Sequence, residues 1–209
     1  MSLIQTLIQA SDSVLVVIDV QDAFLDKLAL AAPSLDATSA PPPDAATLVN
    51  RITWIVQLAQ VLDIPMIVTA EDVPVLGGVT AALQDRIHKH VVVHNKMIFN
   101  MADNPEIMQD LHATGRQTAI LVGLETDVCI AQSAMGLVAS GYQVAVVQDA
   151  VASPGVHHGY GLERMRHTGQ IALTNVKGLY FEWMRTVKAD NQFKAKHLDR
   201  MGTPLGIIL

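Results

Sequence analysis

Short apolar segments alternate with helix-like segments along this chain, and this alternation limits the folds that it can adopt. Most of the apolar segments are continuous runs, which is typical of parallel strands covered on both faces. They span residues 14–19, 65–70, 91–93, 118–123, 143–148 and 170–174. Helical patterns lie between them, over residues 45–62, 105–115, 128–140, 158–168 and 177–187. We therefore expect an α/β protein with a three-layer Rossmann-like fold, in which helices cover both faces of a central, mostly parallel six-stranded sheet.

The length and composition suit one domain of this kind. Of the 209 residues, 50% are hydrophobic and 16% are charged, so a large core can be buried. We find no internal repeat and no linker, and we expect a single domain over residues 1–209. Two segments interrupt the pattern. Residues 30–45 are rich in Pro and are expected to form a loop, either mobile or covering the site, and residues 73–83 turn at Gly77–Gly78 into a short helix.

Charge and cysteine content exclude several classes of protein. The net charge of −6 argues against a nucleic-acid or anionic-membrane partner, because both require a basic surface. A single cysteine cannot form an internal disulfide. The chain has no Lys or Arg before Lys27, unlike a secretory signal, and no apolar run approaches the ~20 residues of a membrane span. We expect a cytoplasmic protein that acts on a small molecule.

Three residues with chemically useful side chains follow predicted strands. Asp19 ends the first strand, Lys96 follows the third and Cys129, the only cysteine, follows the fourth. In an open parallel sheet, ligands bind beyond the carboxyl ends of the strands. We therefore expect an acid, a base and a thiol to meet at one edge of the sheet.

Cys129 lies where a strand ends at Gly123 and a small-residue helix begins. A lone cysteine is commonly a small buried hydrophobe. In the first turn of a helix, however, the positive end of the helix stabilises a thiolate and lowers the pKa of the thiol. A structural sulfur has no need of this position, so we favour a nucleophile with a lowered pKa.

The sequence around Asp19 and Lys96 supports a functional role for both residues. Asp often ends a strand or caps a helix, but Asp22 is the expected cap here, which leaves Asp19 for a buried role. Lysine is usually a surface residue, but Lys96 stands between apolar segments in "VVVHNKMIF", where its ammonium needs a carboxylate partner.

Five stretches of the sequence, taken in chain order, resemble the isochorismatase-like cysteine hydrolase superfamily. This superfamily includes nicotinamidases, N-carbamoylsarcosine amidohydrolases, ureidoacrylate amidohydrolases and isochorismatases. The resemblance runs from about residue 13 to residue 187. The stretches are "VLVVIDVQDAFLD", "VPVLGGVT", "HNKMIF", "VGLETDVCIAQSAMGLVASGYQVAVVQDAVAS" and "GLERMRHTGQIALTNV".

The resemblance implies a catalytic triad of Asp19, Lys96 and Cys129. It also implies a cis Leu124–Glu125 peptide bond, which directs the backbone N–H groups of Glu125 and Cys129 at one substrate oxygen as an oxyanion hole. In the implied reaction Asp19 takes the thiol proton, the thiolate attacks a carbonyl, and Lys96 holds Asp19 in its charged form. The amine then leaves and water releases the acid.

The sequence departs from its relatives in three ways. Metal-using nicotinamidases carry an Asp-x-His after the second strand, where this chain offers only Glu71 and Asp72. Adjacent residues in an extended segment point in opposite directions, so we expect no metal and no other cofactor. The presence of Cys129 counts against isochorismate, whose vinyl ether is hydrolysed without this nucleophile. Relatives often have His at the position of Asp127, whose charge must be directed away or paired.

We therefore expect a metal-independent hydrolase that cleaves a C–N bond of a small carboxamide or ureido compound through a thioester. Phe24 and Phe99 are candidate apolar walls of its pocket, although both could instead be core residues. Three alternatives stay open: a vinyl-ether hydrolase of the isochorismatase type, a catalytically idle interaction scaffold, and a thiol-redox protein. The apolar sequence and the resemblance favour a homo-oligomer, a dimer or larger. The sequence does not identify the substrate.

Overall fold

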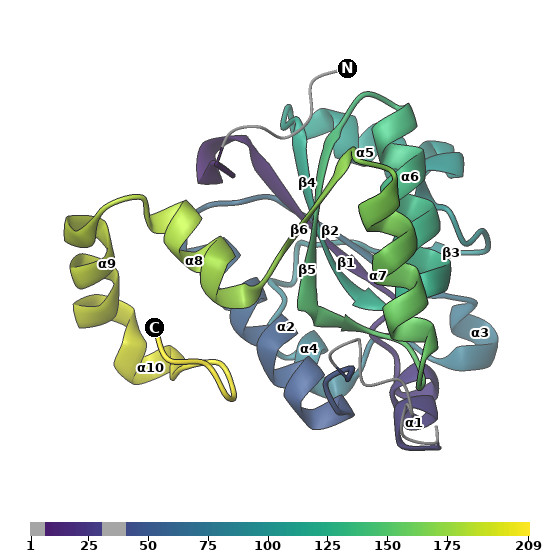
Figure 1. The fold of residues 1–209 in the computed structure, drawn as a ribbon, viewed down its shortest axis with the longest axis horizontal. Helices are drawn as coiled ribbons and strands as arrows, with labels where there is room; N and C mark the ends of the chain where they lie inside the picture. The colour runs from purple at the N-terminus through teal and green to yellow at the C-terminus, as the bar shows by residue number, and fades with distance from the viewer. Residues whose placement is uncertain (1–6, 31–40) are drawn as a thin grey trace.

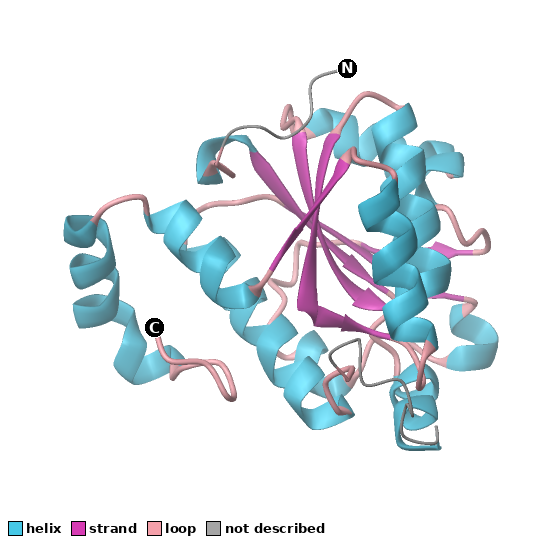
Figure 2. Cartoon of the chain, viewed as in Figure 1, coloured by secondary structure: helices cyan, strands magenta, loops and turns pink. Residues whose placement is uncertain are grey.

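The computed structural model describes residues 7–30 and 41–209. It has a six-stranded sheet between two layers of helices (Figures 1 and 2), as predicted. The strands are β1 (Ser13–Ile18), β2 (Met66–Glu71), β3 (Val93–Lys96), β4 (Thr118–Leu124), β5 (Gln143–Ala152) and β6 (Ile171–Thr174). The α-helices are α1 (Asp22–Leu30), α2 (Ala45–Val61), α3 (Val73–Leu76), α4 (Ala81–Gln84), α5 (Pro105–Ala113), α6 (Ala131–Ala139), α7 (His157–His167), α8 (Val176–Met184), α9 (Val187–Phe193) and α10 (Asp199–Met201). Within these described ranges, no helix has the length and apolar character needed to cross a membrane.

The order of the strands creates a switch point at the centre of the sheet. The order is β3-β2-β1-β4-β5-β6, and every neighbouring pair is parallel. The chain therefore builds outward from β1 to one edge and then resumes with β4 on the other side of β1. Ligands of open α/β sheets bind beyond the carboxyl ends of the strands at such a point. Asp19 directly follows β1, and Cys129 lies shortly after β4.

Both faces of the sheet are buried, which explains the continuous apolar runs in the sequence. On β1, Leu15 and Val17 belong to one core cluster, whereas Val14 and Val16 belong to the other. Side chains of α2 and α8 complete the first cluster, and side chains of α5, α6 and α7 complete the second. Figure 1 shows these two groups of helices on opposite sides of the sheet.

The third strand begins later than predicted. The apolar run 91–93 suggested the strand, but pairing with β2 begins at Val93 and continues to Lys96. β3 is an edge strand, and Val92 is exposed. Its ladder therefore follows the polar sequence "VHNK" rather than the apolar run before it. As a result, Lys96 lies in the last position of a strand, directly beside Glu71 of β2.

Several helices also differ from the prediction. The helix predicted from residue 128 begins as a π-helical turn, Thr126–Ile130, which continues into α6. α1 was not predicted, and Asp22, the expected cap, is its first residue. Residues 73–76, expected to form a loop, form the short helix α3. The loop predicted over residues 30–45 falls largely on residues 31–40, which lie outside the described residues.

Candidate active site

The ammonium of Lys96 lies at the centre of a cluster at the carboxyl ends of the strands. Its Nζ is 2.9 Å from Oδ2 of Asp19 and donates a hydrogen bond of 3.5 Å to Sγ of Cys129. It is also 3.5 Å from Oε2 of Glu71. The structure thus brings together the acid, the base and the thiol that the sequence nominated, and it adds a second carboxylate.

Asp19 is fully buried and rigidly held. Its Oδ1 accepts a hydrogen bond of 2.7 Å from Oγ1 of Thr69. Within residues 7–30 and 41–209, no donor meets Oδ2 with hydrogen-bond geometry, although the Lys96 ammonium lies 2.9 Å away. The backbone of Asp19 has φ +51°, a left-handed conformation that is uncommon outside Gly and often found at functional sites.

Burial raises the pKa of Asp19 above its usual range, and the opposing effects of Lys96 and Thr69 are smaller. A carboxylate with a raised pKa is a stronger base for a thiol proton.

β4 passes close to the end of β1 because Gly123 has no Cβ. At the φ of +124° that Gly123 adopts, a Cβ would lie 1.9 Å from the carbonyl oxygen of Ile18.

Cys129 lies in the π-helical turn and is buried. Its Sγ donates a hydrogen bond of 3.4 Å to Oε2 of Glu71. Burial raises the pKa of this thiol, and the nearby charges of Asp19 and Glu71 raise it further, against the lowering effect of Lys96. The expected lowering of the thiol pKa is therefore not found, because burial and two anions outweigh one ammonium.

The turn before Cys129 has an unusual backbone. The Leu124–Glu125 peptide bond is cis. The N–H groups of Val128 and Ile130 donate to the carbonyl of Glu125, at 3.2 and 3.0 Å. Among the turn and loop hydrogen bonds of the described residues, none uses the N–H of Glu125 or Cys129. The role of these two groups as an oxyanion hole stays a prediction.

Glu71 is the site residue that sequence reasoning missed. From the sequence, it was considered only as one of two acidic residues at the place where metal-using relatives carry an Asp-x-His motif. The parallel register pairs Glu71 with Lys96 on the neighbouring strand, which places its carboxylate beside the ammonium. The predicted third strand covered the apolar run 91–93, before Lys96, and had no stated register that would have revealed this contact.

A second set of side chains contacts the π-helical turn that carries Cys129. Asp127 accepts a hydrogen bond of 2.7 Å from Oγ of Ser153, and its other oxygen lies 3.5 Å from Nδ1 of His157. Asp127 therefore accepts a hydroxyl hydrogen bond and lies beside an imidazole of α7. His158, expected only to begin a helix, is buried, and its Nδ1 lies 2.9 Å from Oγ1 of Thr126. Burial lowers the pKa of His158 to about 4, so its ring is neutral at pH 7.

α7 reaches this turn because Gly161 faces it. A Cβ at Gly161 would lie 2.7 Å from the backbone nitrogen of Asp127. Any larger residue at this position would push α7 away from the turn that carries Cys129. The position of Cys129 therefore depends on contacts with α7 as well as on the sheet.

The two predicted aromatic walls differ in exposure. Phe24 is buried in α1, and Nζ of Lys27 lies 4.4 Å from the centre of its ring. Lys27 also pairs with Oε1 of Glu125 at 3.5 Å, which joins α1 to the turn before the thiol. Phe99 follows Lys96 by three residues and is 52% exposed, so it is not a core residue. Contact of either ring with substrate stays a prediction.

Comparison with known sequences identifies the family. The Isochorismatase domain model matches residues 13–176. The chain belongs to the isochorismatase family. The secreted isochorismatase effector Isc1 of Phytophthora sojae is 31% identical over 141 residues, which cover 65% of this chain and 66% of the relative. The isochorismatase domain-containing protein 2 of Xenopus laevis is 31% identical over 144 residues, 68% of this chain and 67% of the relative. The chain thus spans about two thirds of these relatives.

Solved structures show the same fold at low sequence identity. The MAR1 ribonuclease from Caenorhabditis elegans superposes with a TM-score of 0.77 at 22% identity, covering 98% of both chains. YcaC from Pseudomonas aeruginosa, solved with hexane-2,5-diol and covalent acrylamide, has a TM-score of 0.76 at 19% identity, covering 96% of both. YcaC from Escherichia coli, described as an octameric hydrolase of unknown specificity, has a TM-score of 0.73 at 20% identity, covering 94% of this chain and 93% of the other.

The donor set of this isochorismatase-family protein does not fit a metal ion. Ligand atoms of Asp19, Glu71 and Cys129 lie within 4.8 Å of one another, which is close enough for one cation. All three side chains, however, already contact the Lys96 ammonium. A divalent ion at their centre would have to displace or approach this buried positive charge, which is strongly unfavourable. The ammonium takes the place that a metal would occupy.

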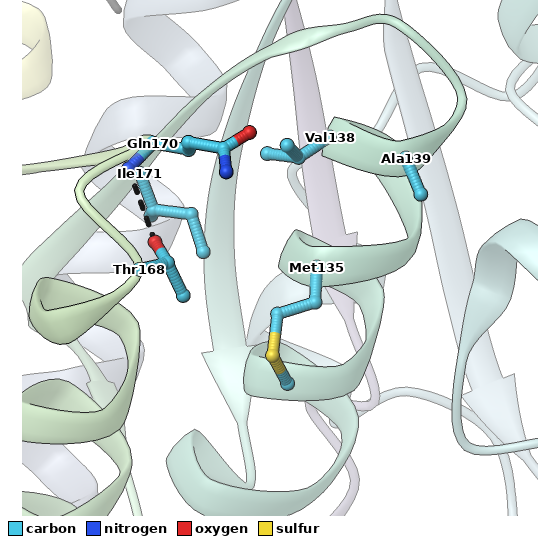
Figure 3. A pocket seen from close by; sticks show the side chains of 6 residues that line it. All are labelled: Met135, Val138, Ala139, Thr168, Gln170 and Ile171. Atoms are coloured by element: carbon cyan, nitrogen blue, oxygen red, sulfur yellow. Dashed lines mark hydrogen bonds between the residues drawn. The ribbon is translucent and has the colours of Figure 1, made fainter.

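A separate apolar cavity of about 250 Å³ lies at the other end of the strands from the Lys96 cluster (Figure 3). It is formed by the end of α6 and the turn from α7 into the beginning of β6, at the amino ends of the strands. A hydrogen bond of 3.1 Å from the backbone N–H of Gln170 to Oγ1 of Thr168 shapes this turn. The lining side chains contain no acid, base or thiol: Met135, Val138, Ala139, Thr168, Gln170 and Ile171. The cavity therefore lacks the groups for hydrolysis.

Proposed function

We propose that this protein is a metal-independent cysteine hydrolase that cleaves a C–N bond of a small carboxamide or ureido compound through a thioester. One observation carries the proposal. The chain's only thiol shares the buried Lys96 ammonium with Asp19, at 3.5 and 2.9 Å, at the switch point of the sheet. A thiol buried only for packing needs neither an ammonium nor carboxylates beside it.

The proposed reaction begins with a protonated thiol. Asp19 accepts the proton of Cys129 while Sγ attacks the substrate carbonyl, and Lys96 stabilises the negative charge that forms. The N–H groups of Glu125 and Cys129 bind the carbonyl oxygen as it becomes an oxyanion. The C–N bond breaks with its electron pair on nitrogen, the nitrogen takes a proton, and a thioester remains. Water then hydrolyses the thioester to the acid and regenerates the thiol.

The small-carboxamide class is supported by the chemistry of the cluster. A neutral resting thiol close to a raised-pKa carboxylate suits attack on a carbonyl, because proton transfer and bond formation occur together. The P. aeruginosa neighbour was solved with covalent acrylamide, itself a small carboxamide. The relatives' names point to isochorismate instead, so isochorismate is included in the test.

The test is a screen of small primary carboxamides and ureido compounds for released ammonia. Cys129→Ala should abolish turnover and leave the fold intact, since it removes one sulfur. Ser140→Ala at the far end of α6 is the matched control and should keep wild-type turnover. Intact-protein mass spectrometry of a rapidly quenched reaction should show the acyl group on the wild-type protein and not on Cys129→Ala.

Two results would contradict the proposal. One is an amide turnover that survives in Cys129→Ala. The other is hydrolysis of isochorismate by both the wild-type protein and this variant, with no amide or ureido compound consumed. The second result would assign a vinyl-ether hydrolase, whose chemistry does not require the thiol.

A further inference from the structure

Two carboxylates flank the thiol, and they differ in what they can reach. The side chain of Asp19 is 0% exposed, whereas that of Glu71 is 19% exposed. A group that protonates a leaving nitrogen must touch that nitrogen. We propose that Glu71 binds the N–H groups of the leaving amine and returns a proton to it, so that the site favours amides and ureido compounds without a negative charge beside the scissile bond. This inference rests on the proposed function and adds to it a proton donor and a substrate class.

Lys96 connects the two carboxylates, so the proton that Asp19 takes from the thiol can reach Glu71. Nζ of Lys96 lies 2.9 Å from Oδ2 of Asp19 and 3.5 Å from Oε2 of Glu71. The ammonium gives one proton to Oε2 and takes the proton from Oδ2, so its charge is unchanged. Oε2–H then protonates the nitrogen as the C–N bond breaks, and both carboxylates are anionic again.

The position of Glu71 next to the nucleophile fits this role. Its Oε2 is 3.4 Å from Sγ of Cys129, so a carbonyl carbon bonded to Sγ, and the nitrogen attached to that carbon, would lie close to Oε2. Asp19 is covered by Thr69 and Lys96 and has no exposed surface from which to meet that nitrogen. The two carboxylates therefore divide the work: one is the base for the thiol, and the other faces the leaving group.

The charge of the cluster defines the substrate class. With a neutral thiol, Asp19, Glu71 and Lys96 sum to one negative charge. Lys27 of α1, which reaches the turn before Cys129, is already paired with Glu125 at 3.5 Å. A carboxylate oxygen accepts N–H donors and disfavours a second anion close by. A primary amide or an unsubstituted ureido group meets this requirement, whereas an amide with a carboxylate near the scissile bond does not.

The test compares Glu71→Gln with the wild-type protein on a primary amide identified by the screen and on the p-nitrophenyl ester of the same acid. An amine leaving group needs a proton, but nitrophenolate does not. Glu71→Gln should lower kcat/KM for the amide by about 10²- to 10⁴-fold, the usual contribution of a general acid, and leave the ester within a few-fold. Asp19→Asn should lose both substrates.

The matched control is Asp72→Asn, next to Glu71 in sequence. Asp72 has φ +40°, a conformation that Asn also tolerates, and this variant should keep wild-type rates on both substrates. Circular dichroism confirms that each variant is folded. Glu71→Gln should also react with iodoacetamide at least as fast as the wild-type protein, because it removes an anion beside the thiol.

The substrate class is tested with propionamide and succinamate. The wild-type protein should prefer the neutral amide by at least about tenfold, and Glu71→Gln should narrow this preference. Equal losses of kcat/KM on the amide and the ester, or slower alkylation of Glu71→Gln, would mean that Glu71 only supports Lys96. Either result would overturn this inference but not the proposed function. A wild-type protein that hydrolyses neither amides nor esters would instead refute the proposed function itself.

Discussion

Replacing either Asp19 or Lys96 alone should lower the unfolding free energy by more than the intact ion pair contributes to it. Both side chains are 0% exposed and their charged atoms are 2.9 Å apart. At an effective dielectric constant of about 20, this separation corresponds to an attraction of about 6 kcal/mol. Asp19→Asn leaves the ammonium without its closest anion, and Lys96→Met leaves a buried carboxylate without its cation. Each change should cost about 3–5 kcal/mol of unfolding free energy.

The assay is urea unfolding followed by circular dichroism, applied to the four proteins of a double-mutant cycle. A domain of this kind has a total stability of about 5–15 kcal/mol, so the single variants require measurement near 15 °C. The double variant should be less destabilised than the sum of the two singles by at least about 1 kcal/mol. Lys27→Met and Glu125→Gln form the matched control cycle, since Lys27 is 51% exposed and that pair should couple by less than about 1 kcal/mol.

Strictly additive losses for Asp19 and Lys96 would show that the two charges do not interact in solution. Lys96 would then have no role in holding Asp19 charged. An equal coupling in the control cycle would also count against the argument, because it would mean that burial does not strengthen the central pair.

Three further predictions concern metal, pH and assembly. Prolonged EDTA treatment should leave turnover unchanged, since the Lys96 ammonium fills the only cluster of metal-ligating groups found among the described residues; activity lost and then restored by zinc, iron or manganese would contradict this. His158 should contribute a fall of about 3 kcal/mol in the unfolding free energy between pH 7 and pH 4, because the pKa of its ring drops from 6.5 to about 4 on folding. The stabilisation is complete above pH 6.5 and is lost as the pH falls through 4, so His158→Gln should flatten this part of the urea-unfolding profile. We also propose a homo-oligomer, which the apolar sequence favours; a light-scattering mass near the 22.5 kDa of one chain would refute it.

The sequence predicted the fold and the central cluster for one physical reason. Continuous apolar strands imply a buried parallel sheet, and parallel strands end at one edge. Asp19 and Cys129 follow the two strands at the switch point, so their meeting depends only on the order of the strands. No side-chain detail was needed to place them together.

Glu71 could not be predicted in the same way, because its contact with Lys96 depends on register rather than on order. A shift of one residue reverses the face on which a side chain lies. β3 is short, lies at the edge and pairs through "VHNK", whereas the predicted strand covered the apolar run 91–93 and left its register open. His158 was missed for a related reason: only the packing of α7 against the π-helical turn that carries Cys129 makes this position a buried one.

The pKa of Cys129 depends in part on Glu71, the residue that sequence reasoning missed. The raised pKa changes how the site is expected to work. From the sequence, a helix end and one lysine favour a thiolate. In the fold, burial and the charges of Asp19 and Glu71 favour the protonated thiol. A resting thiol is less open to oxidation and alkylation than a thiolate, because the thiolate is the reactive form. In the proposed reaction, the negative charge on sulfur then arises only when a bound carbonyl can accept it, so the thiol is protected at rest beside Asp19, its proposed base.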